Sequence, residues 1–200
     1  MQQDLPPSLP RPDAESAAHS ERTAAYIREH IEAAGGSISF AEFMHHALYA
    51  PGLGYYTAGT TKFGEEGDYV TAPEVSAVFG RVLARQCAEV LGQVTSGAIL
   101  EYGAGSGKLA VDMLERLEEL NALPSEYLIL EVSPDLRERQ RALIDERLPR
   151  LAKRVSWVDS VPDRHRGVLV ANEVLDSMPV ERFVRRDTGV MQLRVEADDG

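Results

Sequence analysis

The stretch AILEYGAGSGK (residues 98–108) decides the fold. It joins a short apolar run, which is typical of a buried strand, to a turn with glycine at positions 103, 105 and 107. Residues 108–120 follow with leucine and methionine at helical spacing. A strand, a glycine turn and a helix in this order predict a ligand cradle at the carboxyl end of a strand in a doubly wound sheet.

The segments around this turn alternate between helical and strand patterns. Residues 73–91 carry apolar side chains at helical spacing, and residues 127–132 form the next apolar run. Ser133-Pro134 is typical of a helix start, with a capping hydroxyl followed by proline at the first helical position. Further strand patterns lie at residues 155–158 and 167–171. This alternation predicts an α/β fold with a parallel, doubly wound sheet and helices on both faces.

The N-terminal part of the chain follows a different pattern. Ser20 precedes a helical segment that ends at Gly35-Gly36, and Ser39 with Glu42 has the form of a capping box for a second short helix. Residues 52–68 form a glycine-rich loop. We therefore predict a flexible lead over residues 1–19, a helical extension with a closing loop over residues 20–70, and a ligand-binding domain over residues 71–200.

The end of the chain alternates like a pair of strands. Residues 180–186 and 190–196 have this pattern on either side of a turn at residues 187–189. A seven-stranded sheet would need more residues than follow the fourth strand. We therefore expect a sheet that is incomplete at the C-terminus.

Composition narrows the classes of function. The chain has 200 residues, of which 21 are basic and 32 acidic, and a net charge of −11. Binding to nucleic acid is not expected, because phosphates favour clustered Lys and Arg. The single cysteine cannot build a disulfide framework, and His45-His46 has no further ligands nearby, so we predict no metal site. With no apolar run near 18 residues and no signal or transit peptide, the sequence predicts a bacterial cytoplasmic protein without a membrane span.

The spacing of the glycine turn distinguishes between classes of ligand. Dinucleotide-binding turns favour Gly-x-Gly-x-x-Gly, whereas Lys108 occupies the position of that last glycine here. A phosphate-binding loop would need Ser or Thr where the chain has Leu109. Glu101 can face the ammonium of a methionyl group but would repel a pyrophosphate. Although such a turn can also be a plain strand-to-helix connection, Gly103, Gly105 and Gly107 together with Glu101 favour S-adenosylmethionine as the ligand.

Two further acids follow the next two strands. Glu131 ends the second strand, where a carboxylate can accept both ribose hydroxyls. Asp159 ends the third strand and can accept from an adenine amino group. Each acid alone is also compatible with a surface position, but three carboxylates at successive strand ends indicate one ligand site.

The fourth strand leads into a group of polar residues that we predict to be catalytic: Asn172, Glu173 and Asp176. Methyl transfer requires an acceptor held in line with the methyl group and a place for the proton that it loses. Carboxylates can grip the planar fork of an arginine, which stays protonated in water, so arginine is the favoured acceptor. The alternative interpretation is that Asn172 and Asp176 only stabilise a turn.

Residues 38–183 resemble the MidA-like methyltransferases. The resemblance rests on YAPGLGYY (49–56), FGEEGDYVTAPEVS (63–76), the glycine turn and NEVLDSMPV (172–180). Tyr69 stands where the family commonly has phenylalanine, and the family pattern continues beyond residue 200, so the resemblance implies a truncated domain.

Several properties are implied by this resemblance. They are a class I methyltransferase fold with an N-terminal helical extension, S-adenosyl-L-methionine as cofactor, and an exposed arginine in a partner protein as acceptor. Gly67, Asp68 and Thr71 are implied to help close the donor site. The mitochondrial member of the family is a protein arginine methyltransferase needed for assembly of respiratory complex I, so a complex I subunit or a similar protein is an implied partner.

Two other functions stay open from the sequence. The chain can be an assembly factor that keeps the S-adenosylmethionine pocket without catalysis, or a dinucleotide-dependent oxidoreductase. Substitution of Glu173 and Asp176 separates the first of these from an enzyme, because an assembly function should survive it. The oligomeric state is not predicted.

Overall fold

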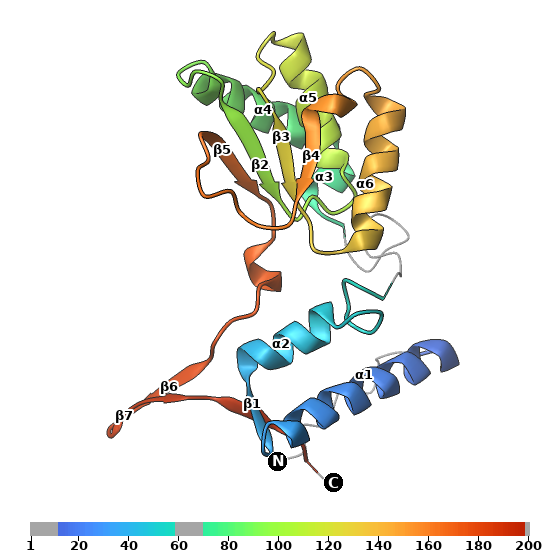
Figure 1. Cartoon of the computed structure of the whole chain (residues 1–200), viewed down its shortest axis with the longest axis vertical. Helices are drawn as coiled ribbons and strands as arrows, with labels where there is room; N and C mark the ends of the chain where they lie inside the picture. The colour runs from blue at the N-terminus through green and yellow to red at the C-terminus, as the bar shows by residue number, and fades with distance from the viewer. Residues whose placement is uncertain (1–11, 59–69, 199–200) are drawn as a thin grey trace. The chain divides into compact units, whose positions relative to one another are not determined.

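The computed structural model describes residues 12–58 and 70–198, and these fall into two compact units. One unit lies within residues 59–178, and the other combines residues up to 58 with residues from 179 onward. Figure 1 shows the elements of each unit. The division differs from the predicted one, which placed a border at residue 71 and gave all later residues to one domain.

A four-stranded parallel sheet with the order β4-β3-β2-β5 forms the centre of the larger unit. The strands are β2 (Ala98–Tyr102), β3 (Tyr127–Leu130), β4 (Val155–Val158) and β5 (Gly167–Ala171). The chain winds outward from β2 to β4 and then returns to the other side of β2, where Tyr102 pairs with Ala171. The order of winding therefore reverses between β2 and β5, and their carboxyl ends lie side by side.

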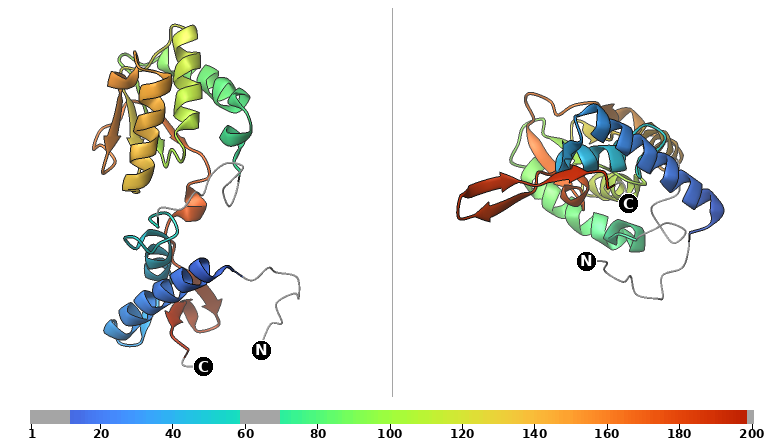
Figure 2. Two further views of the ribbon diagram at one scale, coloured as in Figure 1. Left: turned by 90° about the vertical axis from the view of Figure 1, so that its right-hand side faces the viewer. Right: turned by 90° about the horizontal axis from the view of Figure 1, so that it is seen from below.

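Helices cover one face of this sheet in the part of the chain that the structure describes (Figures 1 and 2). They are α3 (Ala72–Val75), α4 (Ala77–Leu91), α5 (Lys108–Glu119) and α6 (Pro134–Arg147). Ile99, Tyr127 and Ile129 are fully buried beneath α4, α5 and α6, while Leu169 on the opposite face is 57% exposed. The predicted α/β class with a parallel sheet is confirmed. The second helical layer is not among the described residues, because β5 is followed by a single 3-10 turn and a hairpin.

Ser76 divides the helix that the sequence predicts over residues 73–91. Its backbone is extended, with φ −159° and ψ 138°, so it ends α3 and begins α4. Its N–H donates to the carbonyl of Ala72, and its hydroxyl accepts from the N–H of Val78. Apolar spacing continues across the break, which is why the pattern alone predicted one helix.

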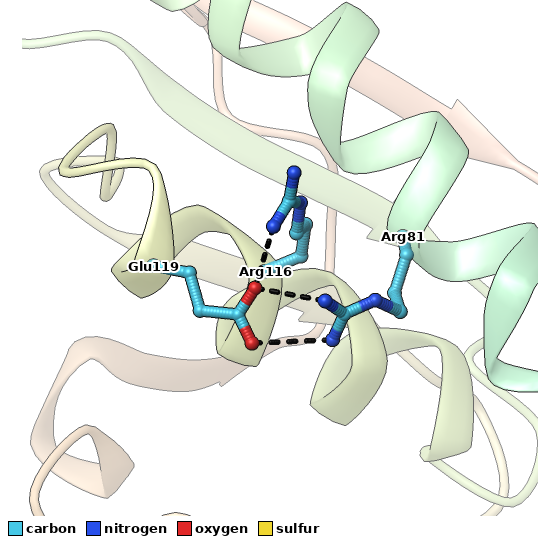
Figure 3. A network of polar contacts seen from close by, with 3 residues as sticks. All are labelled: Arg81, Arg116 and Glu119. Atoms are coloured by element: carbon cyan, nitrogen blue, oxygen red, sulfur yellow. Dashed lines mark hydrogen bonds and ion pairs between the residues drawn. The ribbon is translucent and has the colours of Figure 1, made fainter.

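Close packing and an ion-pair network join α4 to α5. A Cβ added at Gly80 would lie 2.7 Å from the Cβ of Asp112, so only glycine allows this approach of the two helices. Nearer the end of α5, the carboxylate of Glu119 pairs with Arg81 of α4 at 2.8 Å and with Arg116 at 2.6 Å (Figure 3). These side chains are partly exposed and add little stability, but the two parallel bonds from Arg81 fix how the helices align.

The smaller unit begins with α1 (Ala14–Ala33), followed by β1 (Ser37–Ser39) and α2 (Phe40–Tyr49). Helix α1 starts earlier than predicted, since Asp13 rather than Ser20 is its N-cap and accepts from the N–H of Ser16 at 2.7 Å. Residues 14–19 are therefore helical and not part of a flexible lead. The capping box at the start of α2 is confirmed, because Ser39 and Glu42 exchange both expected hydrogen bonds.

The last part of the chain returns to this smaller unit. It forms a hairpin of β6 (Phe183–Arg186) and β7 (Gly189–Gln192), and then β8 (Arg194–Glu196), which pairs antiparallel with β1. The guanidinium of Arg194 donates to the hydroxyl and the carbonyl of Ser37, at 2.9 and 2.8 Å. The single strand predicted over residues 190–196 is thus two strands with different partners. The last residues of the domain predicted over residues 71–200 belong instead to the unit that contains the N-terminal part.

Candidate functional site

The glycine turn connects β2 to α5 with three left-handed residues. The φ angles of Gly103, Gly105 and Gly107 are 57°, 55° and 86°, which other residues adopt only with strain. Space is also short, because a Cβ at Gly107 would lie 3.2 Å from Cγ of Gln140, and one at Gly103 would lie 3.3 Å from a methyl group of Val174. The turn therefore presents bare backbone at the carboxyl edge of the sheet.

Helix α3 is fastened to this turn. The hydroxyl of Ser106 donates to the carboxylate of Glu74, and the ammonium of Lys108 donates to the carbonyl of Glu74 at 2.8 Å. Thr71 is the N-cap residue of α3, although its side chain makes no capping hydrogen bond. Thr71 is one of the residues implied to close the site. It is therefore about one helical turn away from Glu74, which contacts the glycine turn. Gly67 and Asp68 lie outside the described residues.

Glu101 is buried at the end of β2, with 2% of its surface exposed. Its Oε2 accepts a hydrogen bond of 2.7 Å from the hydroxyl of Tyr127 on β3. Burial raises the pKa of Glu101 to about 7, the hydrogen bond from Tyr127 opposes this rise, and the charge of Glu131 adds to it. Oε2 is therefore partly engaged inside the protein, which leaves Oε1 as the less engaged oxygen for the ammonium contact that the sequence suggested.

Glu131 follows β3 and is 4% exposed. Its Oε1 accepts from the N–H of Ser133 at 3.0 Å, and its Oε2 accepts from the side-chain amide of Gln140 at 3.1 Å. Burial raises the pKa of this carboxyl group, and the two hydrogen bonds oppose the rise. The backbone N–H of Val132 also donates to this carboxylate. A carboxylate has about four lone-pair sites, so Glu131 keeps room for a further donor.

Asp159 follows β4, and its side chain is 90% exposed. It forms an ion pair of 2.7 Å with Arg137 of α6. The same guanidinium donates to the carbonyls of Glu131 and Val158, the residues that follow β3 and end β4. Arg137 therefore fastens the two strand ends together and holds Asp159 beside them.

The residues after β5 lie next to the glycine turn. Asn172 and Glu173 follow directly on Ala171, the register partner of Tyr102, and Val174 packs against Gly103. Glu173 has φ 51°, a left-handed conformation that is uncommon for a residue other than glycine or asparagine. Asp176 lies in the 3-10 helix η2 (Leu175–Ser177), and both carboxylates are exposed. Backbone strain of this kind collects at functional sites.

The structure thus brings the predicted residues that follow β2, β3, β4 and β5 to one edge of the sheet. It adds four residues that the sequence reasoning missed: Glu74, Tyr127, Arg137 and Gln140. The importance of Gln140 could have been inferred from its position in the sequence. It stands midway between Leu136 and Ile144, at a spacing of four residues, on the buried side of α6. A polar residue on such a stripe indicates a buried hydrogen-bond network. Among the described residues, no group of three His, Cys, Asp or Glu side chains is placed to hold a metal ion.

A glycine turn at the central strand of a parallel sheet, with acids after three successive strands, defines the class I S-adenosylmethionine-dependent methyltransferase type of site. The comparison with known families agrees. Residues 82–200 match the family described as "Putative S-adenosyl-L-methionine-dependent methyltransferase". The match extends over more than half of the chain, which therefore belongs to this family. Its methyl donor is S-adenosyl-L-methionine, so the predicted cofactor is confirmed at the level of the family.

Solved structures and curated proteins give the same result. A Burkholderia thailandensis protein bound to S-adenosyl-homocysteine is 44% identical, with a TM-score of 0.86 over 96% of this chain and 51% of that one. A second, native structure from that organism is 42% identical, with a TM-score of 0.82 over 96% and 49% of the two chains. The zebrafish mitochondrial protein arginine methyltransferase NDUFAF7 is 30% identical, matched over 82% of this chain and 44% of its own length. The chain spans less than half the length of that relative.

Proposed function

We propose that this chain binds S-adenosyl-L-methionine across the glycine turn and takes part in methyl transfer to arginine in a protein. The observation that carries the proposal is the buried carboxylate of Glu131, which can still accept from a further donor at the edge where Gly103, Gly105 and Gly107 leave the backbone bare. S-adenosyl-L-methionine combines a vicinal ribose diol with a short, positively charged methionyl chain. Both groups supply hydrogen-bond donors that the carboxylates at this edge can accept. When bound, the cofactor supplies an electrophilic methyl group on a sulfonium.

Each acidic residue has its own part in holding the donor. Glu131 accepts from the ribose hydroxyls, and Asp159, which Arg137 holds at the end of β4, accepts from the adenine amino group. Glu101 offers Oε1 to the methionyl ammonium. Thr71, the N-cap residue of α3, helps to close the donor site.

The acceptor lies beside the donor, after β5. Glu173 and Asp176 can hold an arginine side chain as an ion pair, and Asn172 can orient one of its nitrogens. Such a grip brings the reacting nitrogen close to the methyl group and gives its proton a carboxylate to move to. The naming of the zebrafish relative as a protein arginine methyltransferase supports this acceptor. From the resemblance to the MidA-like methyltransferases, we further propose that the partner is a respiratory complex I subunit or a similar protein.

Two measurements test the proposal. Calorimetric titration with S-adenosylmethionine should show saturable binding, and Glu131→Gln should weaken it, while Glu138→Gln on the exposed surface of α6 should leave it unchanged. Transfer of labelled methyl groups to an arginine-containing partner should fall with Glu173→Gln and Asp176→Asn, although the cofactor still binds. Absence of both binding and transfer in the full-length protein would overturn the proposal. Retained assembly activity in those two variants would identify a non-catalytic assembly factor.

The cellular location belongs to the same proposal. Within residues 12–58 and 70–198, no helix has the length and apolar character needed to cross a membrane. The chain has a single cysteine, Cys87, which is buried, and a low cysteine content is typical of proteins in reducing compartments. We place the protein in the bacterial cytoplasm, and fractionation of cells followed by immunodetection tests this location.

A further inference from the structure

Gln140 occupies the centre of a buried polar network beneath the glycine turn. It is fully buried on α6, and it is contacted from two strand ends and one turn. Its side-chain nitrogen donates to the carbonyl of Gly105 at 2.9 Å and to Oε2 of Glu131 at 3.1 Å. Its side-chain oxygen accepts from the indole N–H of Trp157 on β4 at 2.8 Å. One side chain thus links the turn, the residue after β3, and β4.

The chemistry of the three partners permits only one orientation of this amide. The indole of Trp157 can only donate, whereas a carbonyl and a carboxylate can only accept. A rotation of the amide by half a turn would place its oxygen against the Gly105 carbonyl and the Glu131 carboxylate, and its NH2 against the indole N–H. Because the site is buried, the three mismatched contacts would be costly. Trp157 is itself held in place by Arg141, whose guanidinium lies 4.6 Å from the centre of its ring.

The fixed amide in turn fixes the backbone of the glycine turn. Because the peptide between Gly105 and Ser106 is trans and planar, a Gly105 carbonyl that points to Gln140 directs the N–H of Ser106 away from α6. The stem of Gln140 also forms the floor below Gly107, as its Cα, Cβ and Cγ all lie within 3.4 Å of where a Cβ at Gly107 would be. The left-handed turn therefore rests on Gln140 through two independent contacts.

The same amide orients Glu131. With Ser133 on one oxygen and Gln140 on the other, the carboxylate cannot rotate without breaking a buried hydrogen bond. The plane of the carboxylate, and with it the direction of any lone pair that stays free, is therefore set by the protein. A pair of neighbouring hydroxyl groups is the ligand chemistry that such a fixed carboxylate can select.

We propose that Gln140 is the positioning residue of the donor site, which sets the orientation of Glu131 and the glycine turn together and so gives the site its preference for an intact ribose diol. The proposal rests on the donor site proposed above. It assigns Gln140 no contact with the ligand. Its effect passes through Glu131 and through the Gly105 carbonyl.

The test compares three ligands on the unaltered protein and on Gln140→Met, which keeps the length of the side chain and removes the amide. The ligands are S-adenosylhomocysteine and its 2′-deoxy and 3′-deoxy counterparts, each titrated by calorimetry. The unaltered protein should bind the intact ligand at least about tenfold more tightly than one of the deoxy ligands, because a buried hydrogen bond is lost. In Gln140→Met, the affinity for the intact ligand should fall about tenfold, and the preference over the deoxy ligand should fall toward one.

Ile144→Val is the matched control, since Ile144 is buried one turn further along α6 and has no polar group that could bond to the turn or Glu131. It should lower the melting temperature and leave the ligand preference unchanged. If Gln140→Met fails to fold, the ligand preference of Trp157→Phe tests the proposal in its place. It removes the donor that fixes the amide, so the preference should fall at least threefold.

An unchanged ligand preference in Gln140→Met, or in Trp157→Phe where that variant decides, would overturn the role of Gln140 and leave the donor site standing. Absence of binding by the unaltered protein would instead overturn the proposed function, and the role of Gln140 with it.

Discussion

Replacing Glu101 by glutamine should change how the stability of the protein depends on pH. Burial raises the pKa of Glu101 from 4.5 to about 7 in the folded protein. Between these two values the unfolded chain has released a proton that the folded protein still holds, so the stability falls as the pH rises through this range. The stabilising effect is fully present below pH 4.5 and is lost above pH 7. The difference in pKa corresponds to about 3 kcal/mol of folding free energy.

Glutamine is neutral in both states, and its carbonyl oxygen can still accept from the Tyr127 hydroxyl. Glu101→Gln should therefore lose this pH dependence and be more stable than the unaltered protein at pH 8. The difference between the two proteins should grow by about 3 kcal/mol between pH 4.5 and pH 8. Urea denaturation at four pH values, followed by circular dichroism, measures this difference.

Tyr127→Phe extends the same experiment. The hydrogen bond from Tyr127 lowers the pKa of Glu101, so removing it should raise that pKa further and extend the loss of stability to higher pH. Glu138→Gln, which is exposed, should give a profile parallel to that of the unaltered protein. Parallel profiles for Glu101→Gln and the unaltered protein would refute the reasoning, since they would show that Glu101 titrates alike in the folded and unfolded states.

Three further variants test other parts of the site. Gly107→Ala should lower the unfolding free energy by about 1–2 kcal/mol and weaken cofactor binding, because φ is 86° there and the new Cβ meets Gln140. The control Gly92→Ala, at φ −62°, should change neither the unfolding free energy nor the binding. Glu173→Asn should keep or increase the melting temperature, since asparagine tolerates the left-handed backbone, while methyl transfer falls about 10²-fold or more through loss of the carboxylate. Asp112→Asn should raise the melting temperature at pH 7.5, because burial raises the pKa of Asp112 and none of the described residues bonds to its Oδ2. That gain should shrink as the pH falls toward 4.

The fold was largely predictable because its signals are local. The strand at residues 98–102, the glycine turn and the capping residues of α2 and α6 each show in a few neighbouring residues, and the structure has all of them. The start of α1 was placed too late because Asp13 follows a proline-rich stretch and looks like part of it. The pairing of β8 with β1 could not be predicted, since nothing near either strand encodes a partner so far away.

The candidate site was predictable in its positions but not in its contacts. The rule that ligands bind at strand ends places Glu101, Glu131 and Asp159 at one edge from the sequence alone. The partner of Glu101 depends on the register of β2 against β3, which sets Ile99 opposite Tyr127 and is not visible in either strand by itself. The link from Gln140 to Gly105 likewise joins residues 35 positions apart. Such contacts require the packed structure.

The pairing of β8 with β1 also orders events during synthesis. Arg194 and Ser37 are separated by 157 positions, and a ribosome releases the N-terminal residue of such a pair first. Strand β1 therefore leaves the exit tunnel long before its partner strand exists. All strands of the parallel sheet, by contrast, lie between Ala98 and Ala171, so the sheet can form while β8 is still being made. The edge that carries the candidate site can thus be in place before the smaller unit, which contains both the first and the last described elements, is complete.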